Sequence, residues 1–157
     1  MTYQQIHEIL DDFRRVHDEA AACCAAVDDA SDERLRLLAE LFRDGEQRLA
    51  MRLKQTQEGA PAEENTRAAT SLERWVQFVP TGGVDKALRK LRTATEEGSE
   101  ATFVACMALH EQLVKALQHL AEIVPAGEAH DLLQHLANME EQAIRDLGLA
   151  DTMREDG

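Results

Sequence analysis

The sequence contains few of the residues that interrupt a helix or cross-link a fold. Only 3 prolines and 3 cysteines occur among its 157 residues. Pro61, Pro80 and Pro125 each lie within three residues of a glycine, at places where a helix should begin or end. The stretches between them are rich in Ala, Leu, Glu and Arg, which are strong helix formers, and show no alternating strand pattern. The sequence therefore predicts an all-α protein.

Cysteines and long apolar runs are also scarce. Cys23 and Cys24 are adjacent and Cys106 is distant, so the spacing indicates neither a disulfide framework nor a Cys-x-x-Cys metal site. No apolar run approaches the roughly 20 residues that span a bilayer. The first ten residues lack the basic-then-apolar order of a signal peptide. We expect a cytoplasmic protein that does not enter a membrane.

Basic residues are outnumbered: 17 Lys and Arg face 30 Asp and Glu, a net charge of -13. A phosphate backbone would repel such a chain, so we expect no nucleic-acid partner. The basic residues concentrate in one short stretch, Lys86, Arg89, Lys90 and Arg92. This stretch is either a solvated face that balances nearby acids or a contact with an acidic patch on a second copy of the chain.

Apolar residues at three-and-four spacing predict six helices and one domain covering residues 1–157. The first helix should run from about Tyr3 to Val27, the second should be capped by Ser31 or Asp32, and the fifth should be capped by Ser99 after Gly98. The other predicted helices cover residues 62–79, 84–91 and 128–147. The domain divides into a first hairpin at 1–58, crossover helices at 61–97, a second hairpin at 99–148 and a frayed tail at 149–157.

The two hairpins repeat each other. Residues 16–19 (VHDE) resemble residues 109–112 (LHEQ), and the leucines and Glu-Gln pair of residues 37–47 match those of residues 132–142. A lone helical hairpin cannot bury its apolar stripe, so two related hairpins are expected to pack against each other. The middle section then supplies the long connection that this pairing needs.

The order of residues in the second hairpin resembles a known family. His and Glu at 110–111, Leu and Ala at 120–121 and the run LQHLANMEE at 133–141 have the rhythm of a rubrerythrin helical hairpin, and residues 32–35 begin the same pattern in the first hairpin. The chain thus resembles the ferritin-like superfamily, and its rubrerythrin-type members in particular. The resemblance implies a ferritin-like four-helix bundle of two repeated hairpins with a helical crossover between them. It covers about residues 1–58 and 100–150.

The ligands of this family's di-iron site are largely missing. The site takes a Glu from each of two helices and a Glu-x-x-His from each of the other two. Here Glu140 is followed by Ala143 at the histidine position, and the second helix has Gly45 and Arg48 at the matching places. The two remaining carboxylates fall off the apolar stripes of their helices: Asp18 and Glu111. The sequence predicts a degenerate di-iron site, and we expect no cofactor.

Three polar residues nevertheless fall on or beside apolar stripes: His17, His110 and Glu140. Their distances from the hairpin loops, at about 1.5 Å per residue, place them near one level of the bundle. Two imidazoles and a carboxylate suit a single iron, zinc or manganese ion. The other interpretation is a hydrogen-bonded cluster in which Glu140 satisfies a buried histidine. Glu46, at the edge of its helix's apolar face, could join either arrangement.

These observations favour binding or assembly over catalysis, with a homodimer as the first expectation. Because the chain has only one Trp, one Tyr and four Phe, the cluster of Trp75, Phe78 and Val79 is the best interface candidate. One alternative is a metal-dependent redox or oxygen-handling protein built on the His/His/Glu site. Another is a small-molecule carrier whose ligand occupies space opened by Gly45, Ala143 and the small residues of the first helix.

Overall fold

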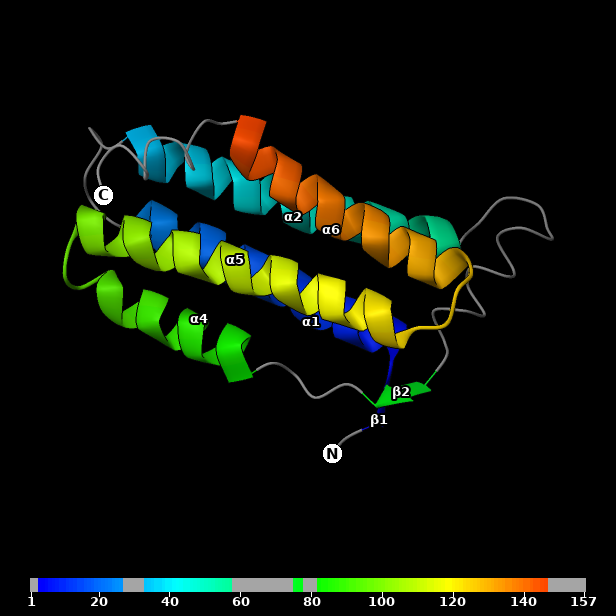
Figure 1. Ribbon diagram of the computed structural model, residues 1–157. Helices are drawn as coiled ribbons and strands as arrows, with labels where there is room; N and C mark the ends of the chain where they lie inside the picture. The colour runs from blue at the N-terminus through cyan, green and yellow to red at the C-terminus, as the bar shows by residue number, and fades with distance from the viewer. Residues whose placement is uncertain (1–2, 27–32, 58–74, 78–81, 147–157) are drawn as a thin grey trace.

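A computed structural model describes residues 3–26, 33–57, 75–77 and 82–146 (Figure 1). Within these residues the chain is helical, apart from two strands of three residues each and the turns at 95–98 and 124–127. The prediction of an all-α protein is therefore confirmed, since helices supply nearly all of the core. The elements follow in the order β1 (Tyr3–Gln5), α1 (Ile6–Ala26), α2 (Glu33–Gln57), β2 (Trp75–Gln77), α4 (Gly82–Ala94), α5 (Ser99–Ile123) and α6 (Glu128–Asp146).

The long helices lie side by side, and sequence neighbours pack against each other. α1 packs mainly on α2, whereas α5 packs on both α6 and α4. Weaker contacts of α5 with α1 and α2, and of α2 with α6, bring the two pairs together. α4 lies along the outer side of α5 and runs in the opposite direction (Figure 1). None of the helices that the structure describes is long and apolar enough to cross a membrane.

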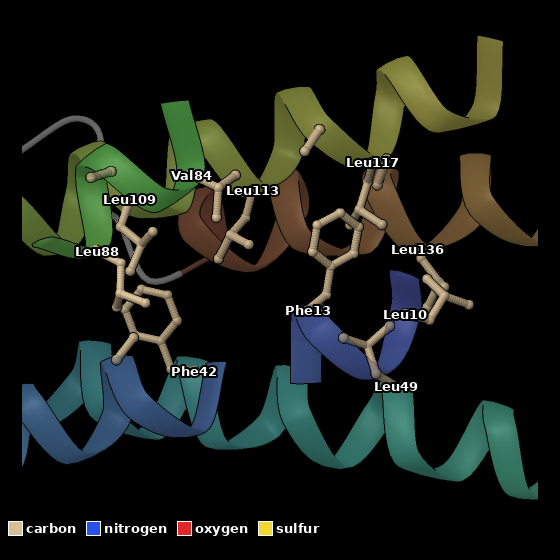
Figure 2. Packing of buried hydrophobic residues seen from close by; sticks show 14 of the residues in the cluster. Leu10, Phe13, Phe42, Leu49, Val84, Leu88, Leu109, Leu113, Leu117 and Leu136 are labelled. Atoms are coloured by element: carbon tan, nitrogen blue, oxygen red, sulfur yellow. The ribbon is translucent and has the colours of Figure 1, made fainter. Parts of the chain in front are cut away.

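The apolar core runs the length of the helices. α5 contributes Leu109, Leu113 and Leu117, which are buried and recur every four residues, so that they form one stripe along the helix. These leucines face Phe13 from α1 and Phe42 from α2 (Figure 2). α5 also buries residues on other sides because it packs against α4 as well as α6. It is therefore the central helix on which both neighbours depend.

Two segments predicted to be helical are strands instead. Tyr3–Gln5 was expected to begin the first helix, and Trp75–Gln77 to lie in the helix at 62–79; they pair antiparallel, with Tyr3 opposite Gln77. Aromatic and β-branched residues favour strands once a partner strand is available, and Val76 is buried as part of the apolar core. The interface candidate Trp75 thus lies in β2, while Phe78 and Val79 lie outside the described residues.

The fifth helix begins with a glycine cap instead of the predicted serine cap. Gly98 is the N-cap residue, with a φ of 112° that favours glycine, and Ser99 is the first residue of the helix. The Thr102 hydroxyl, which is buried, lies 2.7 Å from the Gly98 carbonyl oxygen and 3.1 Å from that of Ala94. This threonine ties the α4–α5 turn to the first turn of α5. The predicted caps Ser31 and Asp32 lie outside the described residues.

Candidate functional site

Three of the four buried polar side chains among the described residues meet in the core. His17 comes from α1, His110 from α5 and Glu140 from α6, and they are 0%, 3% and 3% exposed. The fourth, Thr102, lies in the first turn of α5 and hydrogen-bonds to residues beside the α4–α5 turn. The structure thus brings together the three residues that the sequence placed at one level of the bundle. We call them the His–Glu–His cluster.

His17 is held at both ring nitrogens. Nδ1 donates to the Phe13 carbonyl oxygen at 2.7 Å, and Nε2 lies 3.2 Å from Glu140 Oε1. A carbonyl oxygen and an ionised carboxylate can only accept hydrogen bonds, so both nitrogens of the ring must carry a proton. The contacts therefore define His17 as an imidazolium ion paired with a carboxylate.

The pKa values of Glu140 and His17 shift in opposite directions, and both shifts favour the charged form of the side chain. Burial by itself raises the pKa of Glu140, but the close contacts and charges of His110 and His17 outweigh it and hold this pKa well below its usual range. Burial by itself lowers the pKa of His17, but the hydrogen bond and charge of Glu140 raise it above its usual value. The core thus contains an ion pair at neutral pH.

The contact between His110 and Glu140 is less complete. His110 Nε2 lies 3.2 Å from Glu140 Oε2, which is ion-pair distance. The orientation is too poor for a hydrogen bond, and neither buried atom has another hydrogen-bond partner within the described residues. Glu140 Oε2 therefore has an electrostatic contact with the His110 ring but no well-directed hydrogen bond.

Two residues of α2 complete the site, at the positions where the family pattern would have ligands. Arg48 Nη1 lies 3.3 Å from Glu140 Oε1 and adds a second positive charge. A Cβ atom on Gly45 would lie 2.6 Å from His17 Cδ2 and 2.8 Å from Glu140 Oε1. Glycine is thus needed for α2 to approach the ion pair this closely. The space beside Gly45, proposed above for a ligand, is filled by His17 and Glu140.

An aromatic ring seals the cluster. Phe42 is fully buried, and its ring meets His17 edge-on at 6.0 Å between centroids and His110 at 6.1 Å. An apolar ring against both imidazoles keeps water away and strengthens the charge interactions inside. The sequence showed Phe42 only as one member of an apolar stripe, so its contact with the histidines was missed.

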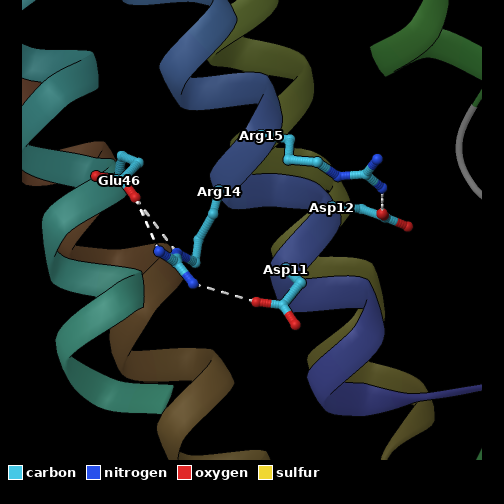
Figure 3. A network of polar contacts seen from close by, with 5 residues as sticks. All are labelled: Asp11, Asp12, Arg14, Arg15 and Glu46. Carbon is cyan, nitrogen blue, oxygen red and sulfur yellow. Dashed lines mark hydrogen bonds and ion pairs between the residues drawn. The ribbon is translucent and has the colours of Figure 1, made fainter. Parts of the chain in front are cut away.

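Glu46 does not join the cluster. Its Oε1 accepts hydrogen bonds from Arg14, with Nη2 at 3.1 Å, and Arg14 also pairs with Asp11 at 3.3 Å (Figure 3). These side chains are partly exposed, as are Asp12 and Arg15, which pair nearby. Glu46 therefore links α2 to α1 near the surface, where an ion pair contributes little to stability.

The charges of the cluster oppose a bound divalent cation. A metal would need the Nε2 lone pair of His17, which carries a proton in this arrangement, and it would add positive charge beside Arg48. Within the part of the chain that the structure describes, no group of three His, Cys, Asp or Glu side chains is arranged to hold a metal ion. The di-iron centre implied by the ferritin-like resemblance does not fit these residues.

A second feature lies on the surface, in an open groove between α4 and α5. Three basic side chains line it from α4: Lys86, Arg89 and Lys90. Its α5 side is apolar, and Val104 is 50% exposed there. At the end nearest the α4–α5 turn the lining is acidic, with Glu97 and Glu100. The fourth basic residue of this stretch, Arg92, lies outside the groove and forms an ion pair with Glu19 of α1.

Comparison of the chain with models of known families, with curated proteins and with solved structures finds no match.

Proposed function

We propose that this protein is a ferritin-like helical bundle that acts by assembly, as a homodimer formed through the α4–α5 groove, and not by metal chemistry. The observation that carries the proposal is the layout of the groove, which is basic along α4, apolar along α5 and acidic near the turn. Such a surface is complementary to a second copy of itself.

The argument rests on two-fold symmetry. In a two-fold dimer, residue i of one copy meets residue j of the other, and j meets i. α4 and α5 run in opposite directions from their shared turn, so the acidic end of the groove and the basic side chains of α4 lie at different positions along it. An axis near Ala101, which lines the groove between its acidic end and its basic side chains, would bring Arg89 and Lys90 of each copy toward Glu97 and Glu100 of the other. The exposed Val104 side chains, one helical turn from this axis, would then be buried close to the centre, where interfaces are most apolar.

The His–Glu–His cluster in the core supports the second part of the proposal, that the protein does not act by metal chemistry. Its charges pair with one another, and Gly45 and Phe42 close it against a ligand. A closed ion-paired cluster can fix the positions of α1, α2, α5 and α6 relative to one another. We infer that the His–Glu–His cluster lies where the ferritin-like resemblance would put a catalytic centre, and that its role here is structural.

The oligomeric state tests the proposal. Sedimentation velocity of the wild-type chain should show a dimer at low salt that weakens as salt is added, because exposed charge pairs are screened. A variant with Arg89→Glu and Lys90→Glu should be monomeric under the same conditions. The matched control carries Arg15→Glu and Arg43→Glu, which make the same change in charge at exposed positions outside the groove. A monomeric wild-type protein, or a control as monomeric as the variant, would overturn the proposal.

One observation favours a second candidate, a metal-dependent redox or oxygen-handling protein. His110 Nε2 and Glu140 Oε2 face each other at 3.2 Å without a hydrogen bond, as two ligands of one ion would. Elemental analysis of the protein, purified without a His tag, separates the two candidates. Stoichiometric iron, zinc or manganese that is lost in both His17→Ala and His110→Ala would support the metal and contradict the assembly proposal's account of the cluster.

A further inference from the structure

Apart from the His–Glu–His cluster, the core contains two reactive side chains in contact. Cys24 of α1 and Cys106 of α5 are free thiols that are 3% and 0% exposed. Their Sγ atoms are 2.6 Å apart. Unbonded carbon atoms pack at about 3.5–4.0 Å, and sulfur is larger than carbon, so this approach is closer than ordinary packing. The two sulfur atoms are close enough to be joined by a two-electron oxidation.

The two cysteines lie near the His–Glu–His cluster along the same two helices. Cys24 lies two helical turns from His17 on α1, and Cys106 lies one turn from His110 on α5. The thiol pair and the His–Glu–His cluster therefore lie along the same seam between α1 and α5. That seam joins the first pair of long helices to the second.

We propose that Cys24 and Cys106 are a modification site, at which a peroxide oxidises the two thiols to a disulfide that joins α1 to α5. The first thiol sulfur attacks a peroxide oxygen and breaks the O–O bond, which gives a sulfenic acid and, from hydrogen peroxide, water. The second sulfur then attacks the sulfenic sulfur, the S–S bond forms and a second water leaves. The two thiols together lose two electrons and two protons, and the peroxide is reduced.

Burial sets the rate of this reaction. The thiolate is the nucleophile, and the contact with Cys24, together with burial, holds the pKa of Cys106 far above its usual range. The first attack must therefore occur while the site is briefly open. Cys24 lies in the last described turn of α1, and helix ends open locally at low free energy. We expect slow oxidation that accelerates when low denaturant increases local opening.

Cys23 provides a built-in control. It is adjacent to Cys24 and half-buried, and burial raises its pKa as well. In the structure, however, the sulfur in contact with Cys106 belongs to Cys24. A Cys23→Ser variant should therefore form the disulfide as the wild type does, whereas Cys24→Ser and Cys106→Ser should not.

The test counts thiols and maps the bond. The wild type and the three serine variants are incubated with hydrogen peroxide, with and without low denaturant, and are then unfolded and alkylated. We expect one alkylated thiol in the oxidised wild type, three in the reduced protein and none in oxidised Cys23→Ser. Trypsin leaves Cys23 and Cys24 in one peptide, residues 16–34, and Cys106 in another, residues 93–115. Their cross-linked product in Cys23→Ser identifies the bond as Cys24–Cys106.

Thermal unfolding gives a second, independent readout. A cross-link between residues 82 positions apart restricts the unfolded chain, so the oxidised protein should have a higher Tm than the reduced protein, and reductant should reverse the increase. Three alkylatable thiols after oxidation would overturn the proposal. So would a cross-link that is lost in Cys23→Ser, or a disulfide that joins two chains and not α1 to α5. None of these outcomes depends on the oligomeric state proposed above.

Discussion

Replacing Glu140 with glutamine should destabilise the protein more than any single surface change. The substitution keeps the size and shape of the side chain and removes its charge. Glu140 is 3% exposed and faces His17 and His110 at 3.2 Å and Arg48 at 3.3 Å. Without the carboxylate, the His17 imidazolium and the Arg48 guanidinium lose the negative charge that compensates them in the core.

The size of the effect follows from these contacts. Removing one partner of a buried ion pair costs about 3–5 kcal/mol. We expect the lower end, about 3 kcal/mol, because the glutamine carbonyl can still accept one hydrogen bond and Arg48, which is 23% exposed, can turn toward water. In a chain of this size each kcal/mol lowers Tm by about 2–4 °C, so Glu140→Gln should lower Tm by roughly 6–12 °C.

Urea unfolding followed by circular dichroism, together with a thermal melt, measures the change at pH 7. Glu141→Gln is the matched control, because Glu141 is the next residue of α6 and pairs only with Arg145 at the surface among the contacts described. That substitution should alter the free energy of unfolding by less than about 0.5 kcal/mol. Equal effects of the two substitutions would refute the assignment of an ion pair to the core.

A triple variant, His17→Leu, His110→Leu and Glu140→Leu, separates the charge argument from simple packing. Replacing a whole buried ion pair with apolar residues is often neutral or stabilising, whereas breaking it is costly. The triple variant should therefore be more stable than Glu140→Gln. A triple variant less stable than the single substitution would contradict this account of the cluster.

Three further predictions concern the cluster and the groove. Gly45→Ala should lower the free energy of unfolding by about 1–3 kcal/mol despite the helix preference for alanine, because the new Cβ would lie 2.6 Å from His17 Cδ2. Urea titration measures this change, and a variant more stable than the wild type would contradict the close approach of α2 to His17. The raised pKa of His17 stabilises the fold fully below pH 6.5, the ordinary pKa of histidine, and this contribution is lost as the pH rises through the pKa of His17 in the folded protein. The lowered pKa of Glu140 stabilises the fold above pH 4.5, the ordinary pKa of glutamate, and this contribution is lost as the pH falls through the pKa of Glu140 in the folded protein. The stability of the wild type relative to the triple leucine variant should therefore be highest between these pH values, and a difference that is constant from acid to alkaline pH would contradict the ion pair. Val104→Glu should weaken the dimer without changing the far-ultraviolet spectrum, as measured by sedimentation against Ala22→Glu, an exposed position on α1.

Periodic features of the fold could be predicted from the sequence. The apolar stripes placed α1, α2, α5 and α6 to within a few residues where the structure describes their ends, because burying one face of a helix imposes that spacing. The same periodicity put His17, His110 and Glu140 on inward faces. Their role as metal ligands stays a prediction, as does the resemblance to the ferritin-like superfamily.

Features that depend on a distant partner could not be predicted. The residues of β2 form a strand because β1 lies beside them, and no local pattern contains that partner. Gly45 and Arg48 were recognised only as missing ligands, since their contacts with Glu140 require the packing of α2 on α6. The hydrogen bond from His17 to the Phe13 carbonyl oxygen is different, because its partner is local: the carbonyl four residues earlier in a helix is within reach of a histidine side chain.

The most direct test of assembly through the groove mixes two variants with reversed charges. One carries Arg89→Glu and Lys90→Glu, and the other carries Glu97→Lys and Glu100→Lys. Each should be monomeric alone, because like charges would meet across the two-fold axis. In an equimolar mixture every contact again joins opposite charges, so sedimentation velocity should show a heterodimer. A mixture that stays monomeric while the wild type is a dimer would contradict the proposed interface.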